Sequence, residues 1–242
     1  MSGLVIAIDG PSASGKSTVS QNVAQRLNFI HVDSGSLYRG ITLYFLSHRN
    51  FNLVGSPLVG DRSEDGRAQA RPLHLTRKNN TADSAVIAVA LKQMRMDFMV
   101  RDNAVKFSID GVEPDAALRS EAVNNTVSQI AALPAVREWV VNKLREMPVF
   151  GDLVMEGRDI GTAVFPEAMF KFYLDAAPEE RARRRHLEMA GLNKGVPAYD
   201  DILRSILKRD GIDSSRALAP LKVAPGAVVI QSTTSSIVIF VD

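Results

Sequence analysis

The sequence predicts an α/β fold in which a parallel central sheet lies between two layers of helices. Residues 4–8 (LVIAI) form a short, unbroken apolar run, which is typical of a strand buried on both faces. A glycine-rich turn follows, and residues 17–27 then carry apolar side chains at helical spacing. A second strand over residues 29–32 completes a strand–helix–strand unit, whose crossover is right-handed in nearly all known folds.

The rest of the chain alternates between the same two periodicities. Helical spacing predicts further helices over residues 34–48, 82–96, 118–132, 135–147, 178–190 and 199–209. Short apolar runs predict strands over residues 153–156, 170–174 and 228–231. A polar turn separates two short strands and predicts a hairpin over residues 98–109. Residues 52–80 contain glycine, proline, asparagine and mixed charges without a sustained period, which indicates an irregular surface insertion.

The composition is that of a globular protein rather than a membrane or disulfide-rich one. The chain has 242 residues, of which 45% are hydrophobic and 23% charged, and this suits one domain with inserted lobes. It contains no cysteine, which excludes a disulfide framework and a cysteine nucleophile and fits a reducing cytosol. The first residues lack the features of a signal peptide, and no apolar run approaches the roughly 18–20 residues that span a bilayer. We therefore expect a cytoplasmic protein without a membrane partner.

The net charge of +2 is too small to indicate nucleic-acid binding by itself, but basic residues gather in one late segment. They are Arg181, Arg183, Arg184, Arg185, Arg204, Lys208, Arg209 and Arg216. Composition leaves two interpretations open, a solvated helical face or a surface that handles phosphate groups.

The strongest motif is GPSASGKS at residues 10–17, which matches the pattern G-x-x-x-x-G-K-[ST]. It lies after a buried strand and at the start of a helix, where such a P-loop binds phosphate groups. Gly10 and Gly15 allow backbone N–H groups to point inward at phosphate oxygens. Lys16 can then reach the β- and γ-phosphates, and the Ser17 hydroxyl can bind Mg²⁺. The predicted nucleotide-binding residues are Gly10, Pro11, Ser12, Ala13, Ser14, Gly15, Lys16, Ser17 and Thr18.

This motif does not identify the phosphate acceptor, because GTPases, motor ATPases and small-molecule kinases share it. A GTPase would carry the guanine-binding pattern Asn-Lys-x-Asp. The nearest candidate, NKGV at residues 193–196, lacks the aspartate. The sequence therefore weighs against a GTPase.

Two further segments carry polar residues on predicted helices. In DSGSLYR at residues 33–39, Ser34 is a candidate helix N-cap, and the planar guanidinium group of Arg39 could bind a monophosphate. An ordinary capped helix on the protein surface would have the same sequence pattern. Polar residues also occur in SQIA at residues 128–131 and in PAVR at residues 134–137. Two helices whose polar positions simply face water would show the same pattern.

Two more segments follow predicted strands or helices late in the chain. MEGRDIGTAVFP at residues 155–166 continues a predicted buried strand, at the sheet edge where open α/β folds bind ligands. RDGIDSSRALAPL at residues 209–221 includes Asp213 and Arg216. Their i, i+3 spacing also fits an ordinary ion pair on a helix surface.

Together with IDGP at residues 8–11, these segments resemble the bacterial cytidylate kinases, a branch of the nucleoside monophosphate kinases. The resemblance runs from residue 6 to about residue 234, apart from the insertion. It implies transfer of the γ-phosphoryl group of ATP to CMP or dCMP, with Mg²⁺, in pyrimidine nucleotide metabolism. It also implies a P-loop α/β/α core over about residues 1–50, 115–175 and 220–242, a monophosphate-binding insert with a small antiparallel sheet over about 51–114, and a helical lid over about 176–219.

The same resemblance assigns roles to individual residues. Arg39 and Arg158 would hold the acceptor phosphate, and Asp159 would accept a hydrogen bond from the cytosine amino group. The other expected substrate-binding residues are Ser34 in the first segment, Ser128 and Arg137 beside the cytosine, Arg209 and Asp213 at the ribose, and Arg216 against the nucleoside. Arg181 and Arg184 would bind ATP at the lid, one of them stacked on adenine. The expected catalytic residues, which act through charge, are Lys16, Arg39, Arg158 and Arg184.

Two departures from the family pattern concern the lid and the end of the chain. Residues 211–212 and 214–215 replace residues that are often charged, and the family usually continues past residue 242 into a longer helix. Two rival functions stay open: a kinase for another small acceptor, such as UMP or shikimate, and a nucleotide-dependent switch or RNA-binding protein. We expect a monomer whose partners are ATP and CMP or dCMP, and no nucleic acid.

Overall fold

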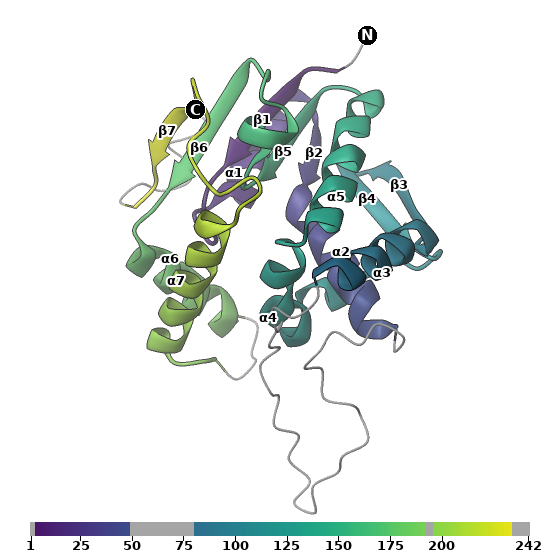
Figure 1. Ribbon diagram of the computed structural model, residues 1–242. Helices are drawn as coiled ribbons and strands as arrows, with labels where there is room; N and C mark the ends of the chain where they lie inside the picture. The colour runs from purple at the N-terminus through teal and green to yellow at the C-terminus, as the bar shows by residue number, and fades with distance from the viewer. Residues whose placement is uncertain (1–2, 49–79, 192–195, 234–242) are drawn as a thin grey trace, which may run out of the picture.

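The computed structural model describes residues 3–48, 80–191 and 196–233, with the backbone alone over residues 80–86. This part of the chain forms one seven-stranded sheet with helices packed against it (Figure 1). The strand order is β3-β4-β2-β5-β1-β6-β7, and only the β3–β4 pair is antiparallel among the strands described. The α/β fold class expected from the sequence is confirmed.

The strands are β1 (Val5–Asp9), β2 (Ile30–Asp33), β3 (Met96–Arg101), β4 (Ala104–Ile109), β5 (Leu153–Gly157), β6 (Phe170–Asp175) and β7 (Val228–Gln231). The helices are α1 (Lys16–Leu27), α2 (Ser34–Ser47), α3 (Asn80–Gln93), α4 (Glu121–Ile130), α5 (Pro134–Glu146), α6 (Pro178–Gly191) and α7 (Tyr199–Ser215). Three short helical segments are η1 (Asp115–Arg119), η2 (Met147–Phe150) and η3 (Ile160–Val164). The apolar runs predicted β1, β2, β5, β6 and β7 to within one residue at each end.

Three helix boundaries differ from the predictions. The helix expected over residues 82–96 ends at Gln93, because β3 begins at Met96. The helix expected over residues 118–132 divides at Ser120 into η1 and α4. Helix α7 continues past residue 209, since the exposed Gly211 stays helical at a cost of only about 1 kcal/mol. The insertion expected at residues 52–80 lies almost wholly outside the described residues.

Strand β1 is buried along its whole length, as a central strand covered on both faces must be. Its alternate residues enter two different cores. Val5 and Ala7 belong to the larger core, which α2 and α5 cover, whereas Ile6 and Ile8 pack with α1. The sheet therefore has two covered faces, and α1 lies on one of them directly behind the phosphate loop.

The β3–β4 hairpin is the antiparallel pair expected in the monophosphate-binding insert. It joins the edge of the central sheet through one residue pair, His31 with Ala104. Phe107 of β4 packs so closely on α2 that a Cβ at Gly40 would lie 2.7 Å from the Phe107 ring. The hairpin is thus anchored to α2, and it extends the central sheet instead of forming a separate one.

The parallel strands bring the polar segments of the sequence to one edge of the sheet. Strands β1, β2 and β5 end in register, with Asp9 beside Gly157 and Asp33 beside Glu156. Helices α6 and α7, which belong to the predicted lid, pack on each other through a small apolar cluster that includes Ala182 and Ile206.

Candidate active site

The phosphate loop between β1 and α1 adopts a backbone that needs its glycines. Gly10 has φ +151°, and a Cβ on it would lie 2.1 Å from the Leu174 carbonyl oxygen of the adjacent strand. Gly15 has φ +94° and precedes α1 without any side-chain cap. The N–H groups in the first turn of α1 therefore remain available to an anion, which the helix dipole also favours.

Lys16 is buried at the floor of this loop and is 5% exposed. Its Nζ donates a hydrogen bond to the Pro11 carbonyl at 2.6 Å. Burial, with the charge of Arg158 as the next largest cause, lowers the pKa of Lys16 to about 7. A phosphate group here would favour the ammonium form, as expected for a lysine that binds polyphosphate.

Ser17 points out of the loop and donates its hydroxyl hydrogen to Glu156 Oε2 at 2.8 Å. Burial acts to raise the pKa of Glu156, but the hydrogen bond from His31 and the charge of Lys16 leave it lowered. Neither Glu156 nor His31 was predicted to be a site residue from the sequence. A signal existed for Glu156, because it is a charged residue at the carboxyl end of a predicted buried strand.

A chain of alternating charges connects the end of β5 with helices α5 and α7. Arg158 Nε is 3.1 Å from Asp213 Oδ2, and Arg216 is 3.6 Å from both Asp213 Oδ1 and Asp159 Oδ1. Arg137 closes the chain by an ion pair with Asp159. Four of these five side chains are at most 6% exposed, and that of Arg158 is 19% exposed. The alternative of a solvated Asp213–Arg216 pair is therefore wrong.

Asp159 is the buried centre of this chain. Burial raises the pKa of its carboxyl group, whereas the charges of Arg137 and Arg216 act to lower it. Arg137 also lies over the ring of Tyr38 on α2, with 5.6 Å between guanidinium carbon and ring centroid. Tyr38 was likewise not predicted to be a site residue from the sequence.

Positive charges converge between the phosphate loop and this chain. Burial lowers the pKa of Arg209 to about 10, and the Arg158 charge is the next largest cause. Burial likewise lowers the pKa of Arg39, and Arg158 is among the further causes. Arg158 therefore repels Lys16, Arg39 and Arg209 in the free protein. A region with this excess of positive charge favours a polyanion.

Arg39 and Ser34 on α2 have partners within the protein. Arg39 Nη1 donates to Asn124 Oδ1 at 2.6 Å and to the Leu118 carbonyl. Ser34 is not the N-cap of α2, because Asp33 takes that position and accepts from the Ser36 N–H. The Ser34 hydroxyl instead donates to the Glu156 carbonyl at 2.7 Å. Ser128 lies half-buried on α4, outside the chain of charges.

Three arginines connect helices α6 and α7 to the phosphate loop. Arg181 Nη1 donates to the Ser12 carbonyl at 3.1 Å and pairs with Asp210 at 2.6 Å. Arg184 donates to the Ser14 carbonyl, at 3.4 Å, and to the Ser232 carbonyl. Arg209 Nη1 lies 3.4 Å from Ser12 Oγ, and its buried Nε has no partner.

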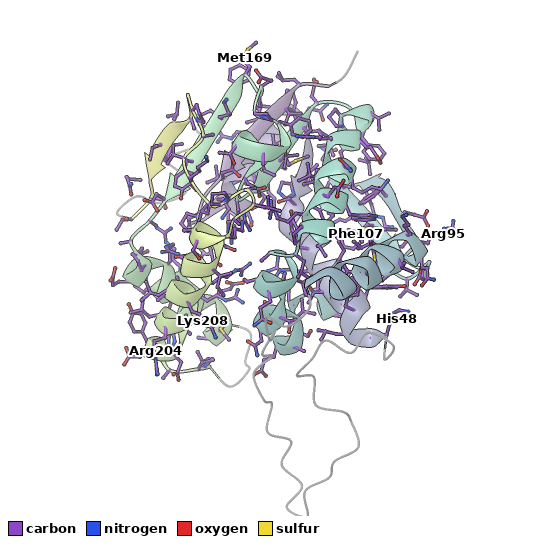
Figure 2. All side chains as sticks on the ribbon, viewed as in Figure 1. His48, Arg95, Phe107, Met169, Arg204 and Lys208 are labelled. Carbon is purple, nitrogen blue, oxygen red and sulfur yellow. The ribbon has the colours of Figure 1, made fainter. Side chains whose placement is uncertain are left out.

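The basic residues of the late segment divide between the two interpretations that composition left open, a solvated helical face and a phosphate-binding surface. Arg204 and Lys208 lie on the exposed face of α7 (Figure 2). Arg183, Arg185 and Arg204 bind carboxylates of their own helices, at 2.6–2.8 Å. The remaining members point inward to the site: Arg181, Arg184, Arg209 and Arg216. Half of the cluster is thus a solvated surface, and half surrounds the candidate site.

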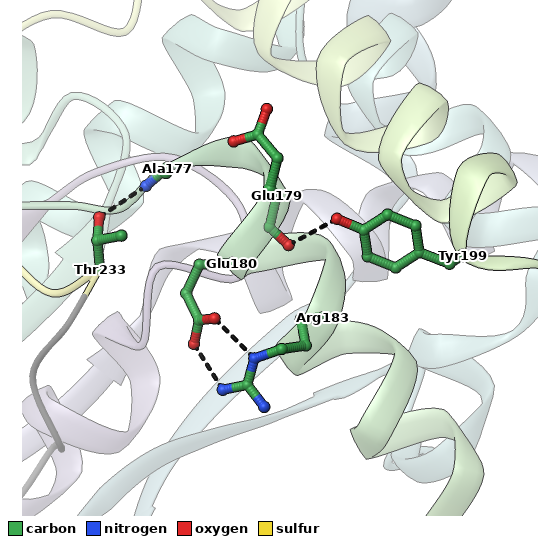
Figure 3. A pocket seen from close by; sticks show the side chains of 6 residues that line it. All are labelled: Ala177, Glu179, Glu180, Arg183, Tyr199 and Thr233. Carbon is green, nitrogen blue, oxygen red and sulfur yellow. Dashed lines mark hydrogen bonds and ion pairs between the residues drawn. The ribbon is translucent and has the colours of Figure 1, made fainter.

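A pocket of about 410 Å³ opens beside the start of α6 and is lined by Ala177, Glu179, Glu180, Arg183, Tyr199 and Thr233 (Figure 3). The positively charged side chain that lines this pocket, Arg183, donates hydrogen bonds to both carboxylate oxygens of Glu180. Glu180 therefore already neutralises the charge of Arg183. Those bonds, with burial opposing them, lower the pKa of Glu180 to about 2. The pocket is therefore poorly suited to phosphate groups, unlike the loop at Lys16.

The described residues contain neither a preformed metal cage nor a membrane-spanning helix. Within them, no three His, Cys, Asp or Glu side chains gather as a metal site would require. Ser17 and Glu156 nevertheless offer two oxygen donors beside the phosphate loop, which suits Mg²⁺ held largely by a nucleotide. None of the described helices combines the length and the apolar character needed to cross a bilayer.

Comparison with known proteins identifies one family. The family model for cytidylate kinase matches residues 6–242. A cytidylate kinase of Fusobacterium nucleatum is 36% identical over 239 residues, which cover 98% of this chain and 93% of that protein. The cytidylate kinase of Desulforamulus reducens is 37% identical over 232 residues, covering 96% and 90%. That of Caldanaerobacter subterraneus is 37% identical over 229 residues, covering 94% and 87%.

Proposed function

The chain belongs to the cytidylate kinase family, and from that premise we propose that it transfers the γ-phosphoryl group of ATP to CMP or dCMP. The products are ADP and CDP or dCDP. The observation that supports this most directly is the convergence of Lys16, Arg158 and Arg209 between the phosphate loop and the buried Asp159. Two phosphate-bearing substrates would meet there and neutralise this charge.

On the donor side, the phosphate loop binds the ATP phosphates through its backbone N–H groups and Lys16. The left-handed backbone at Gly10 and Gly15 and the uncapped start of α1 support this role. Arg181 and Arg184 bring the lid to the same phosphates, because both already contact carbonyl groups of the loop. One of them stacks on adenine when ATP is bound.

Mg²⁺ would be held by Ser17, by the nucleotide phosphates and by Glu156, directly or through water. The 2.8 Å hydrogen bond between the two side chains supports this assignment. The ion would supply positive charge that neutralises the negative charge developing during transfer.

On the acceptor side, Arg39 and Arg158 hold the monophosphate, and Asp159 accepts from the cytosine amino group. Arg137 favours the ionised form of Asp159 and orients its carboxylate through their buried ion pair. The remaining substrate contacts that we propose are Ser128 at the base, Arg209 and Asp213 at the ribose, and Arg216 against the nucleoside. Ser34 contributes indirectly, because its hydroxyl is bound to the Glu156 carbonyl.

Transfer proceeds in line, without a phosphoenzyme. Positioning and charge carry phosphoryl transfer, so no side chain has to act as a nucleophile. Lys16 and the lid arginines stabilise the transferred group, while Arg39 and Arg158 orient the attacking phosphate oxygen. Closure of α6 and α7 over the substrates excludes water, which would otherwise hydrolyse ATP.

A coupled assay of ADP formation tests this function, with ATP against CMP, dCMP, UMP and AMP. We expect rapid transfer to CMP and dCMP and at least about a hundredfold lower kcat/KM for UMP. Equal rates with UMP would indicate a broader pyrimidine kinase. Slow hydrolysis of ATP that ignores every acceptor would favour the nucleotide-dependent switch instead. The expectations of a cytoplasmic monomer without nucleic-acid partners stay predictions.

A further inference from the structure

A buried carboxylate behind the phosphate loop is held from two sides. Glu156 Oε2 accepts from the Ser17 hydroxyl at 2.8 Å, and Glu156 Oε1 lies 3.1 Å from His31 Nε2. Glu156 is 3% exposed and His31 is 7% exposed. The carboxylate thus has one defined donor on each oxygen, the buried His31 on one and the exposed Ser17 at the start of α1 on the other.

The strand register explains why these side chains meet. His31 on β2 is the neighbour of Val154 on β5, and Val154 belongs to the core on the α1 face of the sheet. Glu156 is two residues further along β5, so it faces α1 as well. Ser17 and Ser20 extend from the first turns of α1 toward the same region. Three separate elements therefore converge on one carboxylate.

The hydrogen-bond network determines which ring nitrogen of His31 carries a proton. Ser20 has one hydroxyl hydrogen, which it donates to the Lys16 carbonyl at 2.8 Å. Its oxygen therefore accepts from His31 Nε2, which lies 3.2 Å away. An ionised Glu156 can only accept. His31 Nε2 consequently carries the hydrogen and donates to both neighbours.

We propose that His31 is a positioning residue that fixes Glu156, so that Glu156 orients the Ser17 hydroxyl toward a nucleotide-bound Mg²⁺. This rests on the proposed function. When Glu156 accepts the only hydroxyl hydrogen of Ser17, the lone pairs of that oxygen remain directed at a cation. Glu156 can do so only while its other oxygen is held in place, and His31 supplies that hydrogen bond.

The alternative is that His31 only fills space between β2 and α1. The two interpretations differ in what a loss of the Nε2 donor changes. A space-filling residue affects stability, whereas a positioning residue affects the gain in nucleotide affinity that Mg²⁺ produces. Calorimetric titration of ADP, with Mg²⁺ and with EDTA, measures that gain without any catalytic turnover.

The informative variants are His31→Leu, which removes the donor, and His31→Gln, whose amide reaches a position close to that of Nε2. We expect His31→Leu to reduce the Mg²⁺-dependent gain about tenfold, as removal of an outer partner of a metal ligand commonly does. ADP affinity in EDTA should stay unchanged, and His31→Gln should restore most of the gain. Thr42→Val is the matched control, because Thr42 is a buried hydroxyl donor on the opposite face of the sheet.

A Glu156→Gln background separates action through Glu156 from a direct effect. There, His31→Leu should have no further effect on the Mg²⁺-dependent gain. The proposal is overturned if the folded His31→Leu variant keeps the full Mg²⁺-dependent gain in ADP affinity. It is also overturned if His31→Leu reduces that gain by the same factor in the Glu156→Gln background as in the wild-type protein. If His31→Leu does not fold, His31→Asn takes its place, because its shorter amide cannot reach Oε1. Failure of the wild-type protein to phosphorylate CMP would contradict the proposed function, and these binding ratios would still report on His31.

Discussion

Arg158 and Asp213 form an ion pair, with 3.1 Å between Nε and Oδ2, that joins the end of β5 to helix α7. The two residues are 55 positions apart in the sequence. We propose that the first binds the acceptor phosphate and the second the ribose. On this proposal, helix α7 and the acceptor site are connected through groups that recognise the substrate, and the pair would rearrange when the phosphate binds.

Asp213→Ala should weaken CMP binding by about tenfold or more, because a charge-assisted hydrogen bond contributes roughly 1.5–3 kcal/mol. The variant also leaves Arg158 and Arg216 without a shared carboxylate. ADP affinity should change by less than about threefold, since the donor contacts lie at the phosphate loop. Calorimetric titration with each nucleotide measures both values.

The matched control is Asp201→Ala on the same helix. Asp201 pairs with Arg204 at 2.6 Å, but both side chains are more than half exposed. Such surface pairs contribute about 0–1 kcal/mol, so neither nucleotide should bind differently. Equal losses of CMP and ADP affinity in Asp213→Ala would contradict a specific role on the acceptor side.

Gly10→Ala should distort the phosphate loop, because its Cβ would lie 2.1 Å from the Leu174 carbonyl oxygen at φ +151°. We expect a loss of more than about 1 kcal/mol in unfolding free energy, together with weak ATP binding. Gly211→Ala is the control, because that position is helical and nothing lies within 4 Å of an added Cβ. It should stabilise the protein by about 0.5–1 kcal/mol. Urea unfolding that ranked the two variants in the opposite order would contradict the loop geometry.

Lys16→Ala should lower kcat at least about a hundredfold, as expected when a donor to the transferring phosphoryl group is lost. The fold should persist, since burial already disfavours the Lys16 ammonium group and lowers its pKa to about 7. Lys16→Met keeps the chain volume and should fail in the same way. A folded Lys16 variant with more than a few per cent of the wild-type rate would count against the assignment of this loop.

Asp9 gives the fold a defined pH dependence. Burial raises the pKa of its carboxyl group from 3.8 to about 6, although the N–H groups of Gly161 and Ile160 oppose this. Between these values the folded protein binds a proton that the unfolded chain releases. The contribution of Asp9 to stability is therefore largest below pH 4 and falls as pH rises to 6, by up to about 3 kcal/mol.

Asp9→Asn removes this titration while keeping the shape of the side chain. Urea unfolding of both proteins from pH 4 to pH 7.5 isolates the effect. The difference, wild type minus variant, should decrease as pH rises toward 6 and stay level above it. A constant difference over the range would show that the carboxyl group titrates near its ordinary value.

The sequence was sufficient for those features that depend on local pattern and burial. The apolar run at residues 4–8 predicted β1 because a central strand is buried on both faces. The spacing of Gly10, Gly15 and Lys16 predicted the phosphate loop because each residue has a local conformational or chemical reason to be there. The role expected for Asp159 came instead from the resemblance to the cytidylate kinases, and its burial was not predicted from the sequence.

Features that depend on contacts between distant segments were not predictable. Glu156 meets His31 only because β5 lies beside β2, and no spacing in the sequence reveals that order. Asp33 rather than Ser34 caps α2, since Ser34 turns to the Glu156 carbonyl across the sheet. In the same way, the partner of Asp213 proved to be Arg158 as well as the expected neighbour Arg216.

Base specificity provides the last test, through Asp159 and Arg158. Cytosine carries an amino donor where uracil carries a carbonyl acceptor, so an ionised Asp159 attracts CMP and repels UMP. Asp159→Ala should lower kcat/KM for CMP by an order of magnitude or more, a loss of roughly 1.5–3 kcal/mol. UMP should lose much less, and the CMP-to-UMP ratio should fall.

Arg158→Ala should damage both substrates alike, because the phosphate group is common to them. Asp159→Ala should also destabilise the fold, because it leaves the buried guanidinium group of Arg137 without its ion-pair partner. The expected loss of unfolding free energy is about 3–5 kcal/mol. Rates should therefore be compared below the melting temperature of each variant.

Asp159→Asn supplies a milder comparison, because its amide can both accept a hydrogen bond from cytosine and donate one to uracil. The kcat/KM values for CMP and UMP should therefore differ less in this variant. If Asp159→Ala and Arg158→Ala gave the same substrate profile, Asp159 would not read the base, although the phosphate loop would still support a kinase.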